Sequence, residues 1–298
     1  MSAVVNVVLP VALVVLVGYI AGRNLKFDVG SLSRLTLYVF SPALSFNSMY
    51  GANLSAGSAA RIFLAFGISS FFLYWIARGV ATATGQDAGQ ARSLIATTIF
   101  PNIGNFGLSL TLFAFGDAGV ERGLVTYAAG ALMTFALGPA IISGQGFTRG
   151  VKMTLRLPMI WALVAGVALR ALSIDIPNSV ESSVSLLAGV TIPLLLISLG
   201  IQISQSQITV EKSDWLACFL RLGIGPVAAY SAGRIAGLDA LALKVLVLQC
   251  CTPTAVNALL VAAEFGGDAR KAARIVVLTS LISVVTIPIV MAIMGIHG

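Results

Sequence analysis

The sequence predicts an all-α polytopic membrane protein with ten transmembrane helices, arranged as two inverted repeats of five helices each. Three observations carry this prediction: a strongly apolar composition, ten apolar runs long enough to span a bilayer, and motifs that recur at a nearly constant spacing. Of the 298 residues, 58% are hydrophobic and 10% are charged, and the mean hydropathy is +0.98. Soluble domains carry about 25% charged residues, so we expect one membrane domain over residues 1–298 with short loops.

Charge and residue usage argue against several function classes. The formal net charge is +7, but the basic residues are scattered between apolar runs, so we expect no nucleic-acid partner. Cys218, Cys250 and Cys251 lie within apolar runs, and the only histidine is His297. A metal site, a bound cofactor and a His-dependent triad are therefore not expected. The expected helices hold no nucleophile with an adjacent base, so the sequence does not predict an enzyme.

The ten helices follow from the lengths of the apolar runs. A spanning helix needs about 20 apolar residues, and polar or glycine-rich breaks separate the runs. No basic residue precedes the first run, so we interpret it as a retained helix rather than a secretory signal. The expected helices cover residues 3–21, 32–50, 60–80, 91–115, 123–143, 155–173, 184–203, 214–236, 240–263 and 273–295.

Matched motifs divide the chain into repeat one, residues 1–148, and repeat two, residues 149–298. Pro101 matches Pro253 at an offset of 152, and Pro42 matches Pro193 at an offset of 151. Because each repeat holds five helices, an odd number, the second repeat must enter the membrane from the other side. The other matches pair Leu9-Pro10 with Leu157-Pro158, Gly18 with Gly166, Gly116-Asp117-Ala118 with Gly267-Asp268-Ala269, and Pro139 with Pro288.

The basic residues indicate the orientation, because Lys and Arg favour cytoplasmic loops. With ten helices, one side collects Arg23, Lys26, Arg34, Arg78, Arg92, Arg149, Lys152, Arg156, Lys212, Arg270, Lys271 and Arg274. The other side collects Arg61, Arg122, Arg170, Arg234 and Lys244. This imbalance places both termini outside the cytosol.

The helices at 91–115 and 240–263 are interrupted by the same device, a proline followed four residues later by an asparagine. A proline cannot donate to the carbonyl one turn earlier. Inside lipid, a broken helix survives only where it is buried in protein or lines a cavity. Two such breaks in equivalent halves indicate the binding site of a transporter, although two structural kinks are the alternative.

The breaks are expected to bind an anion. We expect free carbonyls at Thr97 and Gln249, and unpaired N–H groups over Asn102–Asn105 and Thr254–Asn257. These N–H groups carry the positive ends of the half-helix dipoles, which favour a small carboxylate. The candidate substrate-binding residues are Asn102, Gly104, Asn105, Thr254 and Asn257, with Pro101 and Pro253 as the crossover residues.

Other polar or proline positions are weaker candidates. Possible lining residues of the cavity are Asn47, Pro42, Pro193, Ser198 and Gln249, although a plain kink explains the prolines equally well. Arg221 lies inside the eighth helix, where it either snorkels to the interface or forms an electropositive step on an anion path.

At these residues the chain resembles the auxin efflux carrier family over essentially its whole length. The resemblance rests on Pro42-Ala43-Leu44, on Pro101-Asn102-Ile103-Gly104-Asn105-Phe106-Gly107 and on Pro253-Thr254-Ala255-Val256-Asn257. It implies that helices four and nine cross at Pro101 and Pro253 in a transport domain of helices 3–5 and 8–10, against a scaffold of helices 1, 2, 6 and 7. It also implies carriage of small organic anions, with Asn105 and Asn257 contacting the substrate.

With this resemblance we expect alternating access of the elevator type, with a rocking motion as the alternative, by a homodimer in a bacterial inner membrane. The chain departs from the plant carriers in having only Gly144–Thr154 between helices five and six, and in lacking an acid in helix two. A sodium-coupled symporter of the bile-acid type is the alternative, and a membrane receptor is a third reading. Because no acidic residue stands at the crossing, we expect a uniporter or an anion exchanger.

Overall fold

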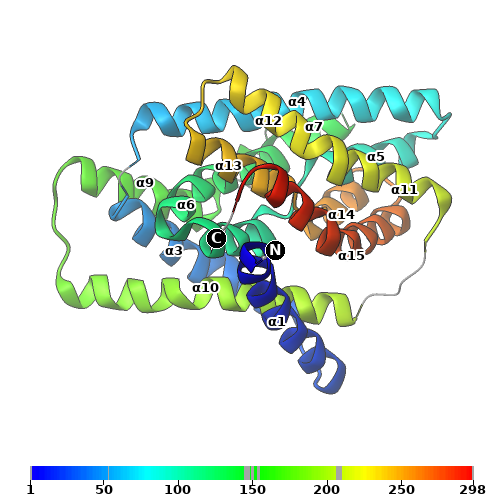
Figure 1. Ribbon diagram of the computed structural model, residues 1–298. Coiled ribbons are helices and arrows are strands. Elements are labelled where there is room, and N and C mark those ends of the chain that lie inside the picture. Colours follow the sequence, from blue (N-terminus) through cyan, green and yellow to red (C-terminus); the bar gives the residue numbers. More distant parts are fainter. Residues whose placement is uncertain are drawn as a thin grey trace.

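The computed structural model describes residues 2–52, 54–143, 148, 151–152, 155–205 and 210–296. Within these residues, all named secondary-structure elements are helices (Figure 1). The first half contains α1 (Ser2–Asn24), α2 (Val29–Leu35), η1 (Thr36–Phe40), α3 (Ser41–Tyr50), α4 (Ala56–Ala83), α5 (Ala88–Ile99), η2 (Ile103–Gly107), α6 (Leu108–Ala131), η3 (Leu132–Leu137) and α7 (Gly138–Ser143). The second half contains α9 (Pro158–Ala171), α10 (Asn178–Ser204), α11 (Lys212–Cys218), η4 (Phe219–Ile224), α12 (Gly225–Ile235), α13 (Ala240–Cys250), α14 (Val256–Glu264) and α15 (Ala269–Ile293). The η segments are π-helical.

Length and composition make this a polytopic membrane protein. Within the described ranges, 6 helical runs are long and apolar enough to cross a bilayer, and α9 and α13 are shorter apolar helices. Large apolar side chains lie exposed on the outer surface, for example Leu186 at 75% and Ile293 at 78%. Such side chains are stable against lipid, whereas a patch of them in water would favour aggregation.

Glycines bring two pairs of helices into backbone contact. A Cβ at Gly18 of α1 would lie 2.3 Å from the carbonyl oxygen of Ile197 in α10. A Cβ at Gly166 of α9 would lie 2.8 Å from the carbonyl oxygen of Phe46 in α3. Small residues allow membrane helices to pack this closely. Positions matched in the sequence, Gly18 and Gly166, therefore serve equivalent helix contacts.

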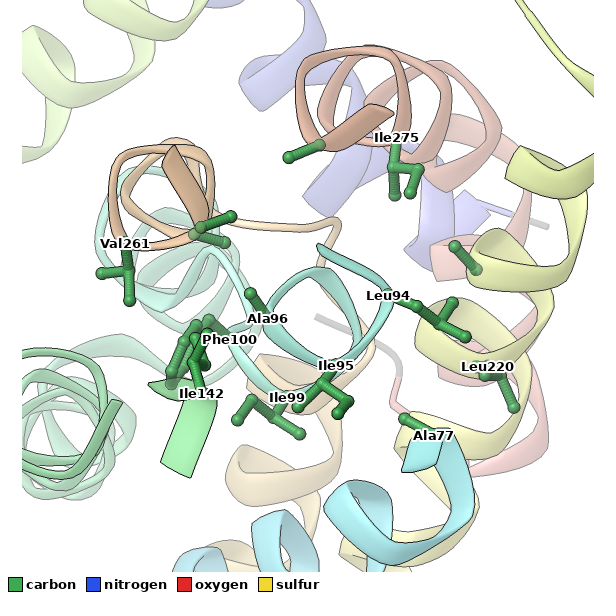
Figure 2. Packing of buried hydrophobic residues seen from close by; sticks show 14 of the residues in the cluster. Ala77, Leu94, Ile95, Ala96, Ile99, Phe100, Ile142, Leu220, Val261 and Ile275 are labelled. Atoms are coloured by element: carbon green, nitrogen blue, oxygen red, sulfur yellow. The ribbon is translucent and has the colours of Figure 1, made fainter. Parts of the chain in front are cut away.

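Helix α5 lies in the centre of a cluster of buried apolar side chains that is separate from the α1–α10 and α3–α9 contacts. Figure 2 shows Leu94, Ile95 and Ile99 of α5 among side chains from α4, α7, η4, α14 and α15, and this cluster contains no residue of α1, α3, α9 or α10. We call α1, α2, η1, α3, α9 and α10 the frame, and the remaining helices the body. In Figure 1, α10 of the frame and α4 of the body run along opposite edges of the molecule, with α6 and α13 between them.

The prolines differ in their effects on the helices. Pro193 lies inside the continuous helix α10, whereas Pro101 and Pro253 lie in gaps between helices. The break expected between the runs 91–115 and 123–143 is confirmed at Gly116, but it is a kink between two helical segments of α6 and not a loop. The helix bends at Gly116, whose φ of 61° is accessible to glycine without a side-chain clash.

Candidate functional site

The two helix interruptions meet each other. The amide of Asn102 donates to the carbonyl oxygen of Pro253 over 2.7 Å, and the amide of Ala255 donates to that of Phe100 over 2.9 Å. These bonds form an isolated antiparallel bridge between Pro101 and Thr254. Extended backbone at both breaks therefore pairs as it would in a sheet, which satisfies polar groups that lipid would leave unpaired.

The expectation of free carbonyls at the breaks is wrong. The hydroxyl of Thr254 donates to the carbonyl oxygen of Thr97 over 2.7 Å, and the hydroxyl of Thr252 donates to that of Gln249 over 2.6 Å. A threonine hydroxyl is a donor that can replace the N–H missing from a proline. Each of these two carbonyls therefore has a side-chain donor in place of the missing proline N–H.

The expectation of unpaired amides is only partly right. The amide of Asn105 donates to the side-chain oxygen of Asn102 over 3.3 Å, and the amide of Thr254 donates to the hydroxyl of Thr279 over 3.1 Å. Three amides at the breaks, those of Gly104, Val256 and Asn257, form no hydrogen bond with another described residue.

The remaining donors line one cavity of about 450 Å³ at the crossing, which lies between the frame and the body. The body contributes Asn102, Gly104, Asn105, Val256 and Asn257 to its wall. The side-chain nitrogen of Asn102 is buried and has no partner within the described residues. The volume is within the usual range for small-molecule sites. Every unpaired donor of the two breaks thus belongs to a residue that lines this cavity.

The frame contributes polar groups to the same cavity, among them Ser33, Ser41 and Ser198. None of the described residues in the cavity wall carries a charge. Opposite, Gly104 is close to the ring of Tyr127, because an added Cβ would lie 3.1 Å from the ring carbon Cε2. The absence of a side chain at Gly104 therefore leaves room for the ring of Tyr127. The cavity can form hydrogen bonds with an anion, but it provides no salt bridge.

Several residues that the sequence singled out lie elsewhere. Thr254 and Pro253 are buried in the crossing, and the side-chain nitrogen of Gln249 donates to the hydroxyl of Thr111 over 3.3 Å. Asn47 and Pro193 line a separate cavity of about 310 Å³. Pro42, in the first turn of α3, lines neither of these two cavities.

Arg221 does not snorkel to the interface. It is fully buried, and its guanidinium donates through Nη1 to the carbonyl oxygen of Thr98 over 2.6 Å and through Nη2 to that of Cys250. It does not line the crossing cavity, so it is not a step on an anion path through that cavity. The sequence could not show this because both partners are backbone atoms, which leave no residue-type signal.

Sequence reasoning also missed residues of the cavity wall, including Tyr127, Thr134 and Gln202. Each is a single polar residue in an apolar run, and single polar residues in membrane helices have no period that marks one face. A buried acid was missed as well. The carboxylate of Asp214, the first residue of the expected helix 214–236, is fully buried and pairs with Arg274 over 2.8 Å.

The chain is similar to known or named membrane transporters over nearly its whole length. The family described as membrane transport protein matches twice, over residues 3–147 and 148–291. A protein of Methanothermobacter thermautotrophicus named "Uncharacterized transporter" is 29% identical over 290 residues, covering 95% of each chain. A Rhizobium meliloti protein named "Putative malonate transporter" is 23% identical, covering 96% of this chain and 94% of its own. The Escherichia coli protein YfdV, named an uncharacterized transporter, is 23% identical and covers 94% of both chains.

Proposed function

The chain belongs to the membrane transport protein family, that of the auxin efflux carriers, and on this premise we propose that it is a secondary transporter of small organic anions. As a membrane transport protein it is not an enzyme. The proposed substrate is a small carboxylate bound in the crossing cavity. The name of the Rhizobium meliloti relative includes malonate, which makes short dicarboxylates the first compounds to test.

The convergence of unpaired donors carries this proposal. The amides of Gly104, Val256 and Asn257 begin the two half-helices, where the dipoles are positive. The side-chain amides of Asn102 and Asn105 add further donors to the same wall. A carboxylate accepts several hydrogen bonds and needs no cationic partner when backbone donors converge on it.

The arrangement of frame and body supports elevator-type alternating access. The proposed scaffold, helices 1, 2, 6 and 7, corresponds to the frame, and the proposed transport domain, helices 3–5 and 8–10, corresponds to the body. Because the cavity wall combines Ser198 of the frame with Asn105 and Asn257 of the body, sliding of the body would carry the asparagines away from the serine. The two family matches and the equivalent contacts of Gly18 and Gly166 support two inverted five-helix repeats, and thus ten helices.

The proposed orientation has both termini outside the cytosol of a bacterial inner membrane. Val7 near the start and Ile296 near the end of the described chain pack in one apolar cluster, which supports termini on the same side. The cavity reaches Gly30 and Ser33, next to a loop expected in the cytosol, which supports an inward-facing state. The proposal includes a homodimer, testable by native electrophoresis of the solubilised chain.

The test is counterflow in proteoliposomes. Vesicles preloaded with an unlabelled carboxylate are diluted into labelled carboxylate, over a series of mono- and dicarboxylates that includes malonate. We expect transient accumulation of label for at least one short carboxylate, and no accumulation in vesicles without protein. Failure with every carboxylate, using protein that is monodisperse and folded, contradicts the proposal.

A further inference from the structure

The position of Arg221 in η4 is the least expected feature of the crossing. Its guanidinium joins the carbonyl of Thr98, in the last turn of α5, to the carbonyl of Cys250, the last residue of α13. Carbonyls in a last turn lack intrahelical partners and carry the negative end of the helix dipole. Thr98 and Cys250 stand at the offset of 152 that also relates Pro101 to Pro253. One guanidinium therefore binds equivalent oxygens of both broken helices.

The surroundings of Arg221 provide space for this cation but no counter-charge. A Cβ at Gly225 would lie 2.7 Å from Nη2 of Arg221 and 3.2 Å from the carbonyl oxygen of Cys250, so this glycine leaves room for the guanidinium. Arg221 forms no ion pair with any carboxylate in the described part of the chain. The π-helical turn around it is a rare element that often marks functional sites.

A buried charge without a carboxylate partner is costly, and a neutral side chain of similar volume is often more stable. Its presence therefore needs a compensating interaction. Two convergent carbonyls at negative dipole ends form a site that attracts a cation. The cavity formed by the opposite ends of the same breaks attracts an anion but contains no charged wall residue. A positive charge nearby in a low-dielectric interior raises the potential felt by that anion.

We infer that the guanidinium of Arg221 is a tethered cation, which fills the position between the two broken helices that a dissolved cation would otherwise occupy. Anion binding in the crossing cavity then requires no co-bound sodium ion. The anion part of this inference rests on the proposed function, whereas the cation part does not. Arg221 is a positioning residue here, because it contacts the two helix ends and not the cavity.

The experiment compares the parent, Arg221→Gly and Arg221→Met in detergent, with two measurements. The first is the melting temperature with low-millimolar methylguanidinium, using tetramethylammonium as the ionic-strength control. Arg221→Gly leaves a space that the added cation can fill, whereas methionine fills much of that space without a charge. We expect methylguanidinium to raise the melting temperature of Arg221→Gly by several degrees, and to leave the parent and Arg221→Met unchanged.

The second measurement is carboxylate affinity, with malonate as the probe, in sodium or N-methylglucamine salts. We expect the parent to bind equally in both salts, and both neutral variants to bind about tenfold more weakly or worse, as for a lost interaction with a charged group. Methylguanidinium should restore affinity in Arg221→Gly alone. A parent that binds no carboxylate contradicts the proposed function, while the melting measurement still decides the role of Arg221.

The inference is overturned if the parent requires sodium to bind the anion, or if Arg221→Met binds malonate as tightly as the parent. A folded Arg221→Gly that does not respond to methylguanidinium also overturns it. If neither neutral variant folds, Arg221→Lys decides, because it keeps the charge. Retained malonate binding by the lysine variant supports the inference, and a folded lysine variant without malonate binding contradicts it.

Discussion

The amide of Asn102 and the carbonyl oxygen of Pro253 are joined by a hydrogen bond of 2.7 Å, so the two broken helices are attached to each other at their breaks. The prolines that remove helix hydrogen bonds are thus compensated by pairing between the breaks. This pairing leaves the amides of Gly104, Val256 and Asn257 without partners among the residues that the structure describes, and all three residues line one cavity. The transport hypothesis depends on these donors.

Asn105→Ala and Asn257→Ala are each expected to weaken carboxylate binding while the protein still folds. Both side chains line the crossing cavity, and a lost hydrogen bond to a charged ligand costs about 1.5–3 kcal/mol, or at least tenfold in affinity. The measurement is the dissociation constant of the best carboxylate from the counterflow series. Asn47→Ala is the matched control, because Asn47 lines the separate cavity and should leave affinity unchanged. Affinities within twofold of the parent in both test variants would remove Asn105 and Asn257 from the site.

Asn102→Asp is expected to abolish anion binding, and the buried negative charge without a cationic partner among the described wall residues should also lower stability. The aspartate retains the oxygen that accepts from the amide of Asn105, but it loses the side-chain nitrogen and adds a negative charge to an uncharged cavity. Asn102→Ala removes the cap as well and should cost about 1 kcal/mol of stability. Melting temperature and carboxylate affinity are compared for both variants. A folded aspartate variant that binds the anion like the parent would show that the anion lies elsewhere.

Gly200→Ala is expected to destabilise the contact between α1 and α10. The new Cβ would lie 2.1 Å from the carbonyl oxygen of Val15, and overpacking of this kind costs about 1–3 kcal/mol. Gly189→Ala is the control on the same helix, because its Cβ meets no atom within 4 Å. The two melting temperatures are compared in one detergent. Equal values would contradict the backbone contact between these helices.

Thiol labelling is expected to reveal opposite orientations of two positions at or next to the matched motifs Gly116-Asp117-Ala118 and Gly267-Asp268-Ala269. Cys218, Cys250 and Cys251 are buried, so a membrane-impermeant maleimide should not label the folded parent. Asp117→Cys should react from outside the cell, and Arg270→Cys only from the cytosolic side, because both positions are exposed but belong to different repeats. Labelling of both from the same side would contradict the inverted repeat. Gly146, in the connection between helices five and six, is expected to be cytoplasmic, and His297, near the C-terminus, is expected to be external. Both lie outside the described residues.

Exchange is expected to proceed without sodium and without a pH gradient. No carboxylate lines the crossing cavity among the described residues, and the buried Asp214 is bound by Arg274. A proton-coupled step between pH 5 and 8 would need a group with a pKa in or near that range. The measurement is counterflow with equal pH on both sides in sodium-free buffer. Exchange that begins only when a proton or sodium gradient is imposed would disprove uniport or anion exchange.

The sequence alone determined the class of the protein and the location of its breaks. Ten apolar runs of about 20 residues each are stable as helices in the hydrocarbon core of a bilayer, so the membrane class follows from composition. Pro101 and Pro253 interrupt helices wherever they stand in one, because the missing N–H and the ring clash are local properties. The offset of 152 between them indicated that the two breaks are equivalent, and both were found in gaps between helices.

Only the tertiary structure decided which polar groups at the breaks are available to a ligand. Thr254 was expected in the site, but its hydroxyl satisfies the carbonyl of Thr97, 157 residues away. Arg221 was expected either at the interface or on an anion path, but it is buried between the carbonyls of Thr98 and Cys250. Hydrogen bonds to backbone atoms of a distant segment leave no pattern in the residue types. The sequence therefore predicts where helices break, whereas the fold determines which donors remain unpaired.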